Sequence, residues 1–232
     1  MGTGTFSFGT AIHKKMAVPN KKEVKFNMLN GTIIAGNEPV VEVKENEIKI
    51  LNSKLAPLFF KKSNNVEVWL EKRAIDSHRT NSRILKKALR LKETDDINTV
   101  LSVNAVSLTD NYWFRRPEEE ELKWEDVRFK ENLYSLVALK GDMSGFFEKP
   151  SKTPELTNIG SYEKCWKLEN GQWWMYKHGS KEEIFSELFI YNLGKELGFR
   201  MAKYEYDNEN YIKSLDFTNG NEVNFESMYS LV

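Results

Sequence analysis

The chain has 232 residues, of which 40% are hydrophobic and 29% charged, and its 34 basic and 34 acidic side chains give a formal net charge of zero. This much apolar sequence can bury a core, which excludes a chain that is disordered throughout. Zero net charge argues against a dedicated nucleic-acid or membrane-surface binder, and no apolar run approaches the ~20 residues of a membrane-spanning helix.

Cysteine and histidine are too few for disulfide or most metal chemistry. The single Cys165 excludes an intramolecular disulfide and a cysteine zinc cluster, and the three histidines are scattered along the chain. The first residues lack the basic segment followed by an apolar one that is typical of a secretion signal. We therefore expect a cytoplasmic protein with a reduced thiol, no bound metal at these residues and no membrane segment.

Residues 1–22 contain glycine, threonine and lysine without periodicity, and we expect them to form a flexible tail. An N-terminal module of strands and helices is then expected over residues 23–131. Its strands are predicted at Val40–Val43 and Glu47–Leu51, which are rich in Val and Ile. Leu55–Phe60 is apolar but contains a proline, which is typical of an edge strand or a loop.

Two helices are predicted in the middle of this module. Asp76 or Ser77 can cap the first, whose apolar face consists of Ile84, Leu85, Ala88, Leu89 and Leu91. The second is predicted to follow Asp95, with its inward residues being Ile97, Val100 and Leu101. The acidic run Glu118–Glu121 is interpreted as a solvated loop, with a partner-binding patch as the alternative.

A second module is predicted over residues 154–232, after a linker over residues 132–153 that contains two glycines and a proline. Trp166–Leu168 and Trp173–Lys177 are expected to form a hairpin, because the Asn-Gly pair between them is the strongest short hairpin signal.

The clearest predicted helix of the chain follows this hairpin. Ser180 caps its start and Glu183 stands three residues on, which forms a capping box, and Gly198 is a suitable stop. Its apolar positions predict a buried stripe of Phe185, Leu188, Phe189, Leu193 and Leu197. A last hairpin is predicted from Met201–Tyr206 and Tyr211–Leu215.

The order of these parts is that of the small lobe of a protein kinase. In such a lobe a glycine-containing loop allows close backbone approach to ATP phosphates, a strand lysine supplies a charge, and a helical glutamate fixes that lysine. Gly160, Lys177 and Glu187 occupy these places in the same order. We therefore expect an α+β fold whose second module is a kinase-like small lobe, with an antiparallel sheet and one main helix.

Several short stretches carry a resemblance to a known family. In the second module they are Gly160-x-x-Glu163-Lys164, Met175-Tyr176-Lys177, Ser186-Glu187, Leu193–Phe199 (LGKELGF) and Ile212–Asp216 (IKSLD). In the first module they are Ala74–Leu89 and Ser107–Trp113 (SLTDNYW). Together these stretches resemble the HipA-like serine/threonine kinases, the toxin kinases of bacterial toxin–antitoxin pairs, and their relatives in Firmicutes. The resemblance covers roughly residues 25–232.

The resemblance implies a phosphate-binding end of a nucleotide site. Lys177 would contact the ATP phosphates, with Glu187 as its ion-pair partner. The loop that contains Gly160 and Lys164 would lie over the phosphates. Thr157, three residues before that glycine, would be the site of an autophosphorylation that switches the enzyme off.

The resemblance also implies an adenine-binding end. Ser214, Leu215 and Asp216 would form the hinge whose backbone binds the base. The implied cofactors are ATP and Mg²⁺, and the implied partner is a protein substrate or an antitoxin.

The catalytic residues of the family follow the hinge, in a large helical lobe, whereas this sequence ends at Val232. We therefore expect a truncated kinase that lacks the large lobe and is inactive as this chain, with no catalytic or magnesium-binding residue of its own. The pattern D-x-H-x-x-N at Asp76–Asn81 matches a catalytic loop, but it precedes the lysine strand, and helix capping is the favoured interpretation.

Two other functions stay open. The absent large lobe favours a non-catalytic regulator or a toxin–antitoxin partner-binding module. The basic stretch Arg79–Lys92 suggests a nucleic-acid accessory factor, although a solvated helix face is the favoured interpretation of these six cationic side chains.

Overall fold

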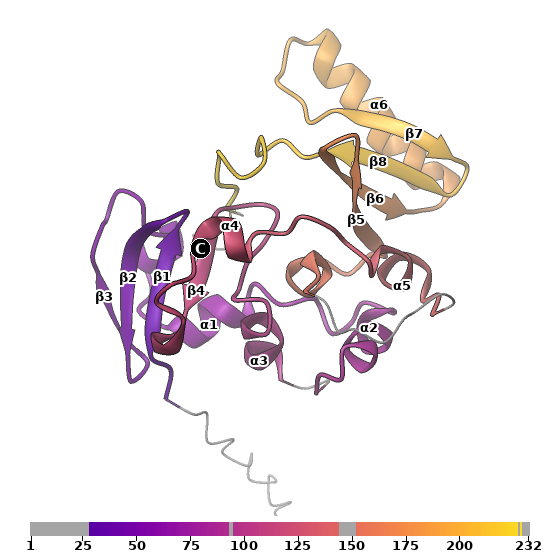
Figure 1. Ribbon diagram of the computed structural model, residues 1–232. Coiled ribbons are helices and arrows are strands. Elements are labelled where there is room, and N and C mark those ends of the chain that lie inside the picture. Colours follow the sequence, from indigo (N-terminus) through magenta and orange to yellow (C-terminus); the bar gives the residue numbers. More distant parts are fainter. Residues whose placement is uncertain (1–27, 93–94, 144–151, 227, 229–232) are drawn as a thin grey trace, which may run out of the picture.

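Two antiparallel sheets and a set of short helices make up the protein, which confirms the expected α+β class (Figure 1). The computed structural model describes residues 28–92, 95–143, 152–226 and 228. The predicted tail, residues 1–22, lies outside these ranges. Within them, no helix is both long enough and apolar enough to cross a membrane.

Sheet A belongs to the N-terminal half of the chain. Its strand order is β3 (Glu47–Ile50), β2 (Glu38–Lys44), β1 (Gly31–Ala35), β4 (Tyr112–Arg115). The positive φ angles of Glu45 and Asn46, 52° and 69°, make the tight turn between β2 and β3. Strands β2 and β3 confirm the two strands predicted at Val40–Val43 and Glu47–Leu51. The sequence does not predict β4, because its partner β1 lies far away along the chain.

The helices of this half are α1 (Val66–Glu71), α2 (Ser82–Ala88), α3 (Asp96–Leu101), α4 (Trp124–Val127) and α5 (Ser135–Lys140), with 3₁₀ turns η1 (Leu58–Lys61), η2 (Pro117–Glu119) and η3 (Pro154–Thr157). The predicted start of α3 is confirmed, since Asp95 Oδ1 accepts the Asn98 N–H at 2.9 Å. The predicted cap of α2 is wrong. Asp76 instead accepts the His78 N–H at 2.8 Å in a local turn, and α2 begins six residues later.

The interpretation of Arg79–Lys92 as a solvated face is wrong for two of its six cations. Arg79 and Lys86 are buried. The Lys86 ammonium lies 2.7 Å from the Asp96 carboxylate and so joins α2 to α3. A buried cation is satisfied by a carboxylate from a distant part of the sequence, which a helical pattern alone does not reveal.

Sheet B belongs to the C-terminal half. Its strand order is β5 (Lys164–Glu169), β6 (Gln172–His178), β8 (Tyr211–Leu215), β7 (Tyr204–Asn208). Both predicted hairpins are confirmed. Asn170 and Gly171, with φ angles of 50° and 77°, form the turn between β5 and β6.

Helix α6 (Lys181–Glu196) connects β6 to β7. Its capping box is confirmed: the Glu183 N–H donates to Ser180 Oγ at 3.2 Å, and the Ser180 N–H donates to Glu183 Oε2 at 2.8 Å. The predicted buried stripe is wrong, because the buried residues of the helix are Ile184 and Gly194, and Gly194 lies against the Met201 side chain. Four stripe residues are exposed: Phe185 by 66%, Phe189 by 50%, Leu193 by 42% and Leu197 by 63%. We call these four residues the exposed arc of α6.

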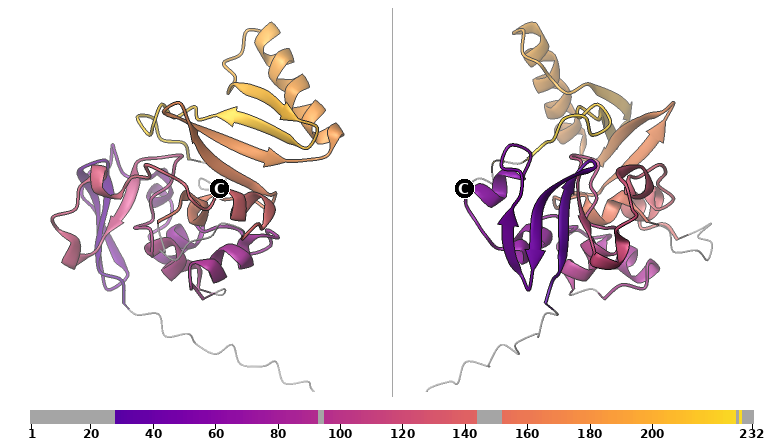
Figure 2. Two further views of the ribbon diagram at one scale, coloured as in Figure 1. Left: turned by 45° about the vertical axis from the view of Figure 1, so that its right-hand side comes forward. Right: turned by 60° about the vertical axis from the view of Figure 1, so that its left-hand side comes forward.

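The two halves share buried apolar surface. Helix α5 lies inside the segment 132–153 that the sequence predicts as a linker, and it packs against one face of sheet B through Ala138 and Leu139. A second cluster contains Trp113 of sheet A together with Trp166 of sheet B. Figures 1 and 2 show sheet A and sheet B as separate layers on different sides of the molecule, and Figure 1 shows α5 next to β5.

The capping box of α6 predicts a stability effect. Replacing Ser180 with Ala removes the acceptor for the Glu183 N–H and should lower the free energy of unfolding by about 1 kcal/mol. Urea denaturation followed by circular dichroism measures this. Ser186→Ala in the same helix is the control, because the Ser186 hydroxyl only bonds back to the Glu182 carbonyl. Equal losses for the two variants would contradict the assignment of the cap.

Candidate functional site

Two lysines lie opposite each other at one end of the hairpin β5–β6. The antiparallel register pairs Lys164 with Lys177, and then Trp166 with Met175 on the same face. Ser214 of β8 lies opposite Met175. We call these five residues the cavity face of sheet B. Because alternate residues of a strand share a face, the register itself brings two cations together.

A carboxylate from α6 neutralises Lys177. The Lys177 ammonium donates to Glu187 Oε1 at 3.0 Å and to the Tyr204 hydroxyl at 3.2 Å. The chain turns from β6 directly into α6 at Gly179 and Ser180, so a residue two turns into the helix lies over the strand. Burial by itself lowers the pKa of Lys177, but the hydrogen bonds to Glu187 and Tyr204 raise it overall. The predicted ion pair is present.

Lys164 differs, because its ammonium makes no hydrogen bond or ion pair with any residue that the structure describes. Burial, followed by the positive charges of Arg79 and Lys177, lowers the pKa of Lys164 to about 8. Gly160 lies directly against it. The φ angle of +104° favours glycine there, and a Cβ atom at Gly160 would require the Lys164 ammonium to move.

A cavity of about 350 Å³ opens on the cavity face. The predicted residues that line it are Thr157, Lys164, Lys177, Ser214, Leu215 and Asp216. Arg73 and Asp110 of the N-terminal half line its other side. A second cavity, of about 480 Å³, lies at the start of α6 and is lined by Glu187 and again by Lys164 and Lys177. The two lysines therefore stand where two cavities meet.

The predicted hinge is already engaged in hydrogen bonds within the chain. The Leu215 N–H donates to the Lys203 carbonyl and the Asp216 N–H to the Trp173 carbonyl, both at 2.9 Å. The Asp216 carboxylate accepts the Thr218 N–H at 2.9 Å and the Thr218 hydroxyl at 2.7 Å. A base bound at this end of the cavity would have to use other atoms of the segment.

The Thr157 hydroxyl is not free to react in this conformation. Thr157 is 4% exposed, and its hydroxyl donates to the Val106 carbonyl at 2.6 Å. Phosphorylation there requires η3 to move away from this contact. The assignment of Thr157 as an autophosphorylation site stays a prediction.

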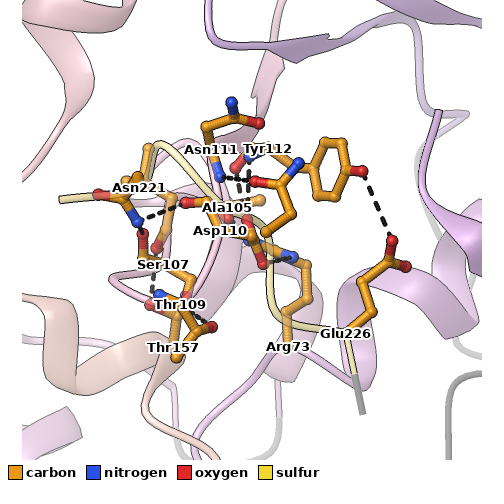
Figure 3. Close-up of polar contacts among 12 residues, drawn as sticks. Arg73, Ala105, Ser107, Thr109, Asp110, Asn111, Tyr112, Thr157, Asn221 and Glu226 are labelled. Carbon is orange, nitrogen blue, oxygen red and sulfur yellow. Dashed lines mark hydrogen bonds and ion pairs between the residues drawn. The ribbon is translucent and has the colours of Figure 1, made fainter. Parts of the chain in front are cut away.

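The motif SLTDNYW contributes Ser107, Thr109, Asp110 and Tyr112 to the wall of the cavity. Figure 3 shows the polar contacts around these residues. Arg73 makes two parallel bonds of 2.8 Å to the two oxygens of Asp110, and both side chains are largely buried. Asp110 Oδ1 also accepts the Tyr112 N–H at 2.9 Å. The sequence analysis connects this motif only with a family resemblance. It does not predict the Arg73–Asp110 pair, because the two residues lie 37 positions apart.

The segment after β8 returns to the same motif (Figure 3). The Asn221 side-chain amide donates to the Asp110 carbonyl at 2.8 Å, and the Phe225 N–H donates to the Thr109 carbonyl at 2.8 Å. The Glu226 carboxylate accepts the Leu58 N–H at 2.9 Å, and burial raises the pKa of Glu226. We call residues 217–226 the strap. It joins the predicted hinge to the N-terminal half.

Behind Lys164, the buried carboxylate of Glu155 joins η3 to β5. It accepts the Trp166 N–H at 2.6 Å and the side-chain amides of Asn132 and Asn158 at 2.8 and 2.9 Å. The Arg79 guanidinium lies 3.6 Å away, and both charged side chains are fully buried. Arg79 also donates to the Lys164 carbonyl. These contacts fix the start of β5 and therefore the position of the unpaired lysine.

The described residues contain no group of three or more His, Cys, Asp or Glu side chains that could together hold a metal ion. The arrangement at the cavity face instead suits an anion. The Lys177 ammonium there is neutralised by Glu187 and the Lys164 ammonium is not, and both lysines line the two cavities.

The Arg79–Glu155 pair predicts a large effect on stability. Glu155→Gln keeps the size of the side chain but leaves the Arg79 guanidinium buried without a countercharge, which should cost about 3–5 kcal/mol of unfolding free energy. Glu125→Gln is the control, because the exposed Arg128–Glu125 pair of similar length should contribute less than about 1 kcal/mol. Urea denaturation of both variants tests this. A loss at Glu155 no larger than at Glu125 would show that the buried charge is compensated in another way.

No protein-family model, curated protein or solved structure matches this chain.

Proposed function

We propose that this chain carries the nucleotide-binding part of a HipA-like serine/threonine protein kinase and binds ATP at the cavity face of sheet B. The observation that carries the proposal is the 3.0 Å ion pair between Lys177 on a central strand and Glu187 on the following helix. Protein kinases use such a strand lysine and helix glutamate to position the α- and β-phosphates of ATP.

The order of the surrounding parts supports the same proposal. The loop with Gly160 comes first, then the lysine strand β6, then α6 with its glutamate, and then β8, whose end forms the predicted hinge. Strand β8 pairs with β6, so Ser214 and Lys177 line one cavity although they lie far apart in sequence. One nucleotide could therefore lie across these two paired strands, with its base near Ser214 and its phosphates near Lys177.

In this proposal the residues of the chain bind and orient the nucleotide. Lys177 holds a phosphate oxygen while Glu187 and Tyr204 keep its ammonium in place, and the Gly160 loop closes over the phosphates. Mg²⁺, when present, would shield the charge between phosphates, and the proposal assigns it no protein ligand among the described residues. It also assigns none of these residues as the catalytic base.

A non-catalytic partner-binding module is the second candidate, and the exposed arc of α6 favours it. Phe185 and Phe189 stack in solvent with their ring centroids 5.9 Å apart, next to the exposed Leu193 and Leu197. Apolar patches of this kind often mark protein contacts. The two candidates differ in one measurable property, which is nucleotide affinity.

The proposal predicts that Lys177→Met weakens ATP binding by roughly tenfold to a hundredfold, because it removes a charge-assisted hydrogen bond to phosphate. Titration of the full chain with Mg-ATP by calorimetry measures this. Lys167→Met is the matched control. Lys167 lies on the other face of the same hairpin, with its ammonium 3.8 Å from the centre of the Tyr176 ring.

Glu187→Gln should give a smaller loss than Lys177→Met, because it loosens the lysine without removing it. ATP affinity that is unchanged by Lys177→Met, or changed equally by Lys167→Met, would contradict the proposal. The absence of any ATP binding would favour the partner-binding module.

A further inference from the structure

We infer that a second copy of this chain covers the exposed arc of α6, so that the α6 helices of two molecules pair antiparallel across a two-fold axis. The inference goes beyond the proposed function and does not depend on nucleotide binding. Glu187, which the proposed function uses, is held by Lys177 of sheet B and is not part of the arc.

The exposed arc forms one continuous ridge along α6. Its four residues follow one another at intervals of four positions, from Phe185 to Leu197, and residues with this spacing are neighbours on a helix surface. Ile190 and Phe199, both more than half exposed, extend the apolar surface. Figures 1 and 2 show α6 at the periphery of the molecule, away from sheet A. A ridge of this kind packs between the same ridges of a second helix, so an identical helix is a suitable partner.

The order of side chains along the ridge suits an antiparallel pair. If the pair is centred at position 191, Phe185 of one copy lies opposite Leu197 of the other, and Phe189 lies opposite Leu193. Each aromatic ring then meets a branched aliphatic side chain at all four places. This is the relation that a two-fold interface requires, because residue i contacts residue j and residue j contacts residue i.

The charges at the two ends of α6 favour the same direction. The first turn has a negative charge, because Lys181 is paired with Glu209 at 3.5 Å and leaves Glu182 and Glu183. The other end has a net positive charge, from Lys195, Glu196 and Arg200. An antiparallel pair brings the acidic end of one helix to the basic end of the other, whereas a parallel pair would bring like charges together.

The apolar surface is large enough for a specific dimer. A fully exposed aromatic side chain presents about 200 Å² and an aliphatic one slightly less, so the arc together with Ile190 and Phe199 exposes roughly 600 Å² in each copy. Two copies would bury roughly 1,200 Å², which exceeds the ~1,000 Å² expected of a specific interface and lies at the lower end of the usual range. This size predicts a reversible dimer with a dissociation constant in the micromolar range.

The experiment is sedimentation velocity of the full chain from about 1 to about 200 µM, a range that spans a micromolar dissociation constant. The sedimentation coefficient should rise from that of a monomer to that of a dimer. Leu193→Glu places a charge in the middle of the apolar interface and should weaken dimerisation by about a hundredfold or more.

Leu136→Glu is the matched control. Leu136 is 46% exposed, close to the 42% of Leu193, and it lies on α5 outside the arc. This variant should dimerise like the wild type. Circular dichroism and thermal unfolding of both variants show that each one folds.

A charge reversal tests the direction of the pair. In the antiparallel pair Glu182 of one copy lies close to Arg200 of the other. Glu182→Arg alone and Arg200→Glu alone each bring like charges together at both ends, and each should weaken the dimer roughly threefold to tenfold at low salt. The double variant should regain the wild-type dissociation constant. Because the two residues lie at opposite ends of α6, pairing within one chain would not explain such a rescue.

Three results would overturn the inference. The first is a wild-type chain that stays monomeric up to about 200 µM, which would leave the arc to a different protein. The second is a dimer that Leu193→Glu does not weaken more than Leu136→Glu does. The third is a double charge variant that dimerises no better than either single one. None of these results changes the outcome of the Mg-ATP titration, so the inference can fail while the proposed function stands.

Discussion

The buried carboxylate of Glu155 is the interaction on which the arrangement of the site depends. It accepts hydrogen bonds from a backbone amide of β5 and from two asparagine side chains, and it faces the guanidinium of Arg79. A buried charge is tolerated only when its partners are nearly complete, and this one joins η3, β5 and the segment before α2. The start of β5, and with it Lys164, is therefore held at a defined place relative to the N-terminal half.

Charge is distributed around the cavity in pairs that join different parts of the chain. Arg73 with Asp110 stabilises the wall of the N-terminal half, Arg79 with Glu155 fixes the base of the hairpin, and Lys177 with Glu187 ties α6 to the sheet. Each pair has no net charge and so leaves little charge for a ligand. Lys164, which also lines the cavity, has no carboxylate partner among the described residues, so a chain of zero net charge still presents a localised positive charge there.

The features that could be predicted from the sequence are those determined by near neighbours. Asn170-Gly171 determines a hairpin turn, Ser180 and Glu183 form their capping box, and the short connection from β6 to α6 brings Glu187 to Lys177. The features that could not be predicted depend on distant partners. Strand β4 forms by pairing with β1, and the buried Arg79 is neutralised by a glutamate that lies in η3.

Helix α6 shows most clearly that a sequence pattern does not determine which face of a helix is buried. Its apolar residues follow a helical period, as predicted, but a period does not say which arc meets the sheet. Ile184 and Gly194 are the buried positions of the helix, and Phe185 lies in solvent. The resemblance to HipA-like kinases predicts Lys164 and Lys177 alike as nucleotide contacts, but only the structure shows that Lys164 has no carboxylate partner among the described residues, whereas Lys177 has Glu187 at 3.0 Å.

The strap has a mechanical consequence for the cavity. Asn221 holds Asp110 across 111 positions of sequence, so the wall of the cavity is a closed ring of chain that runs from sheet B through the strap to the SLTDNYW motif and back through η3. Because both closing hydrogen bonds are buried, sheet B could shift relative to the SLTDNYW motif only if at least one of them broke.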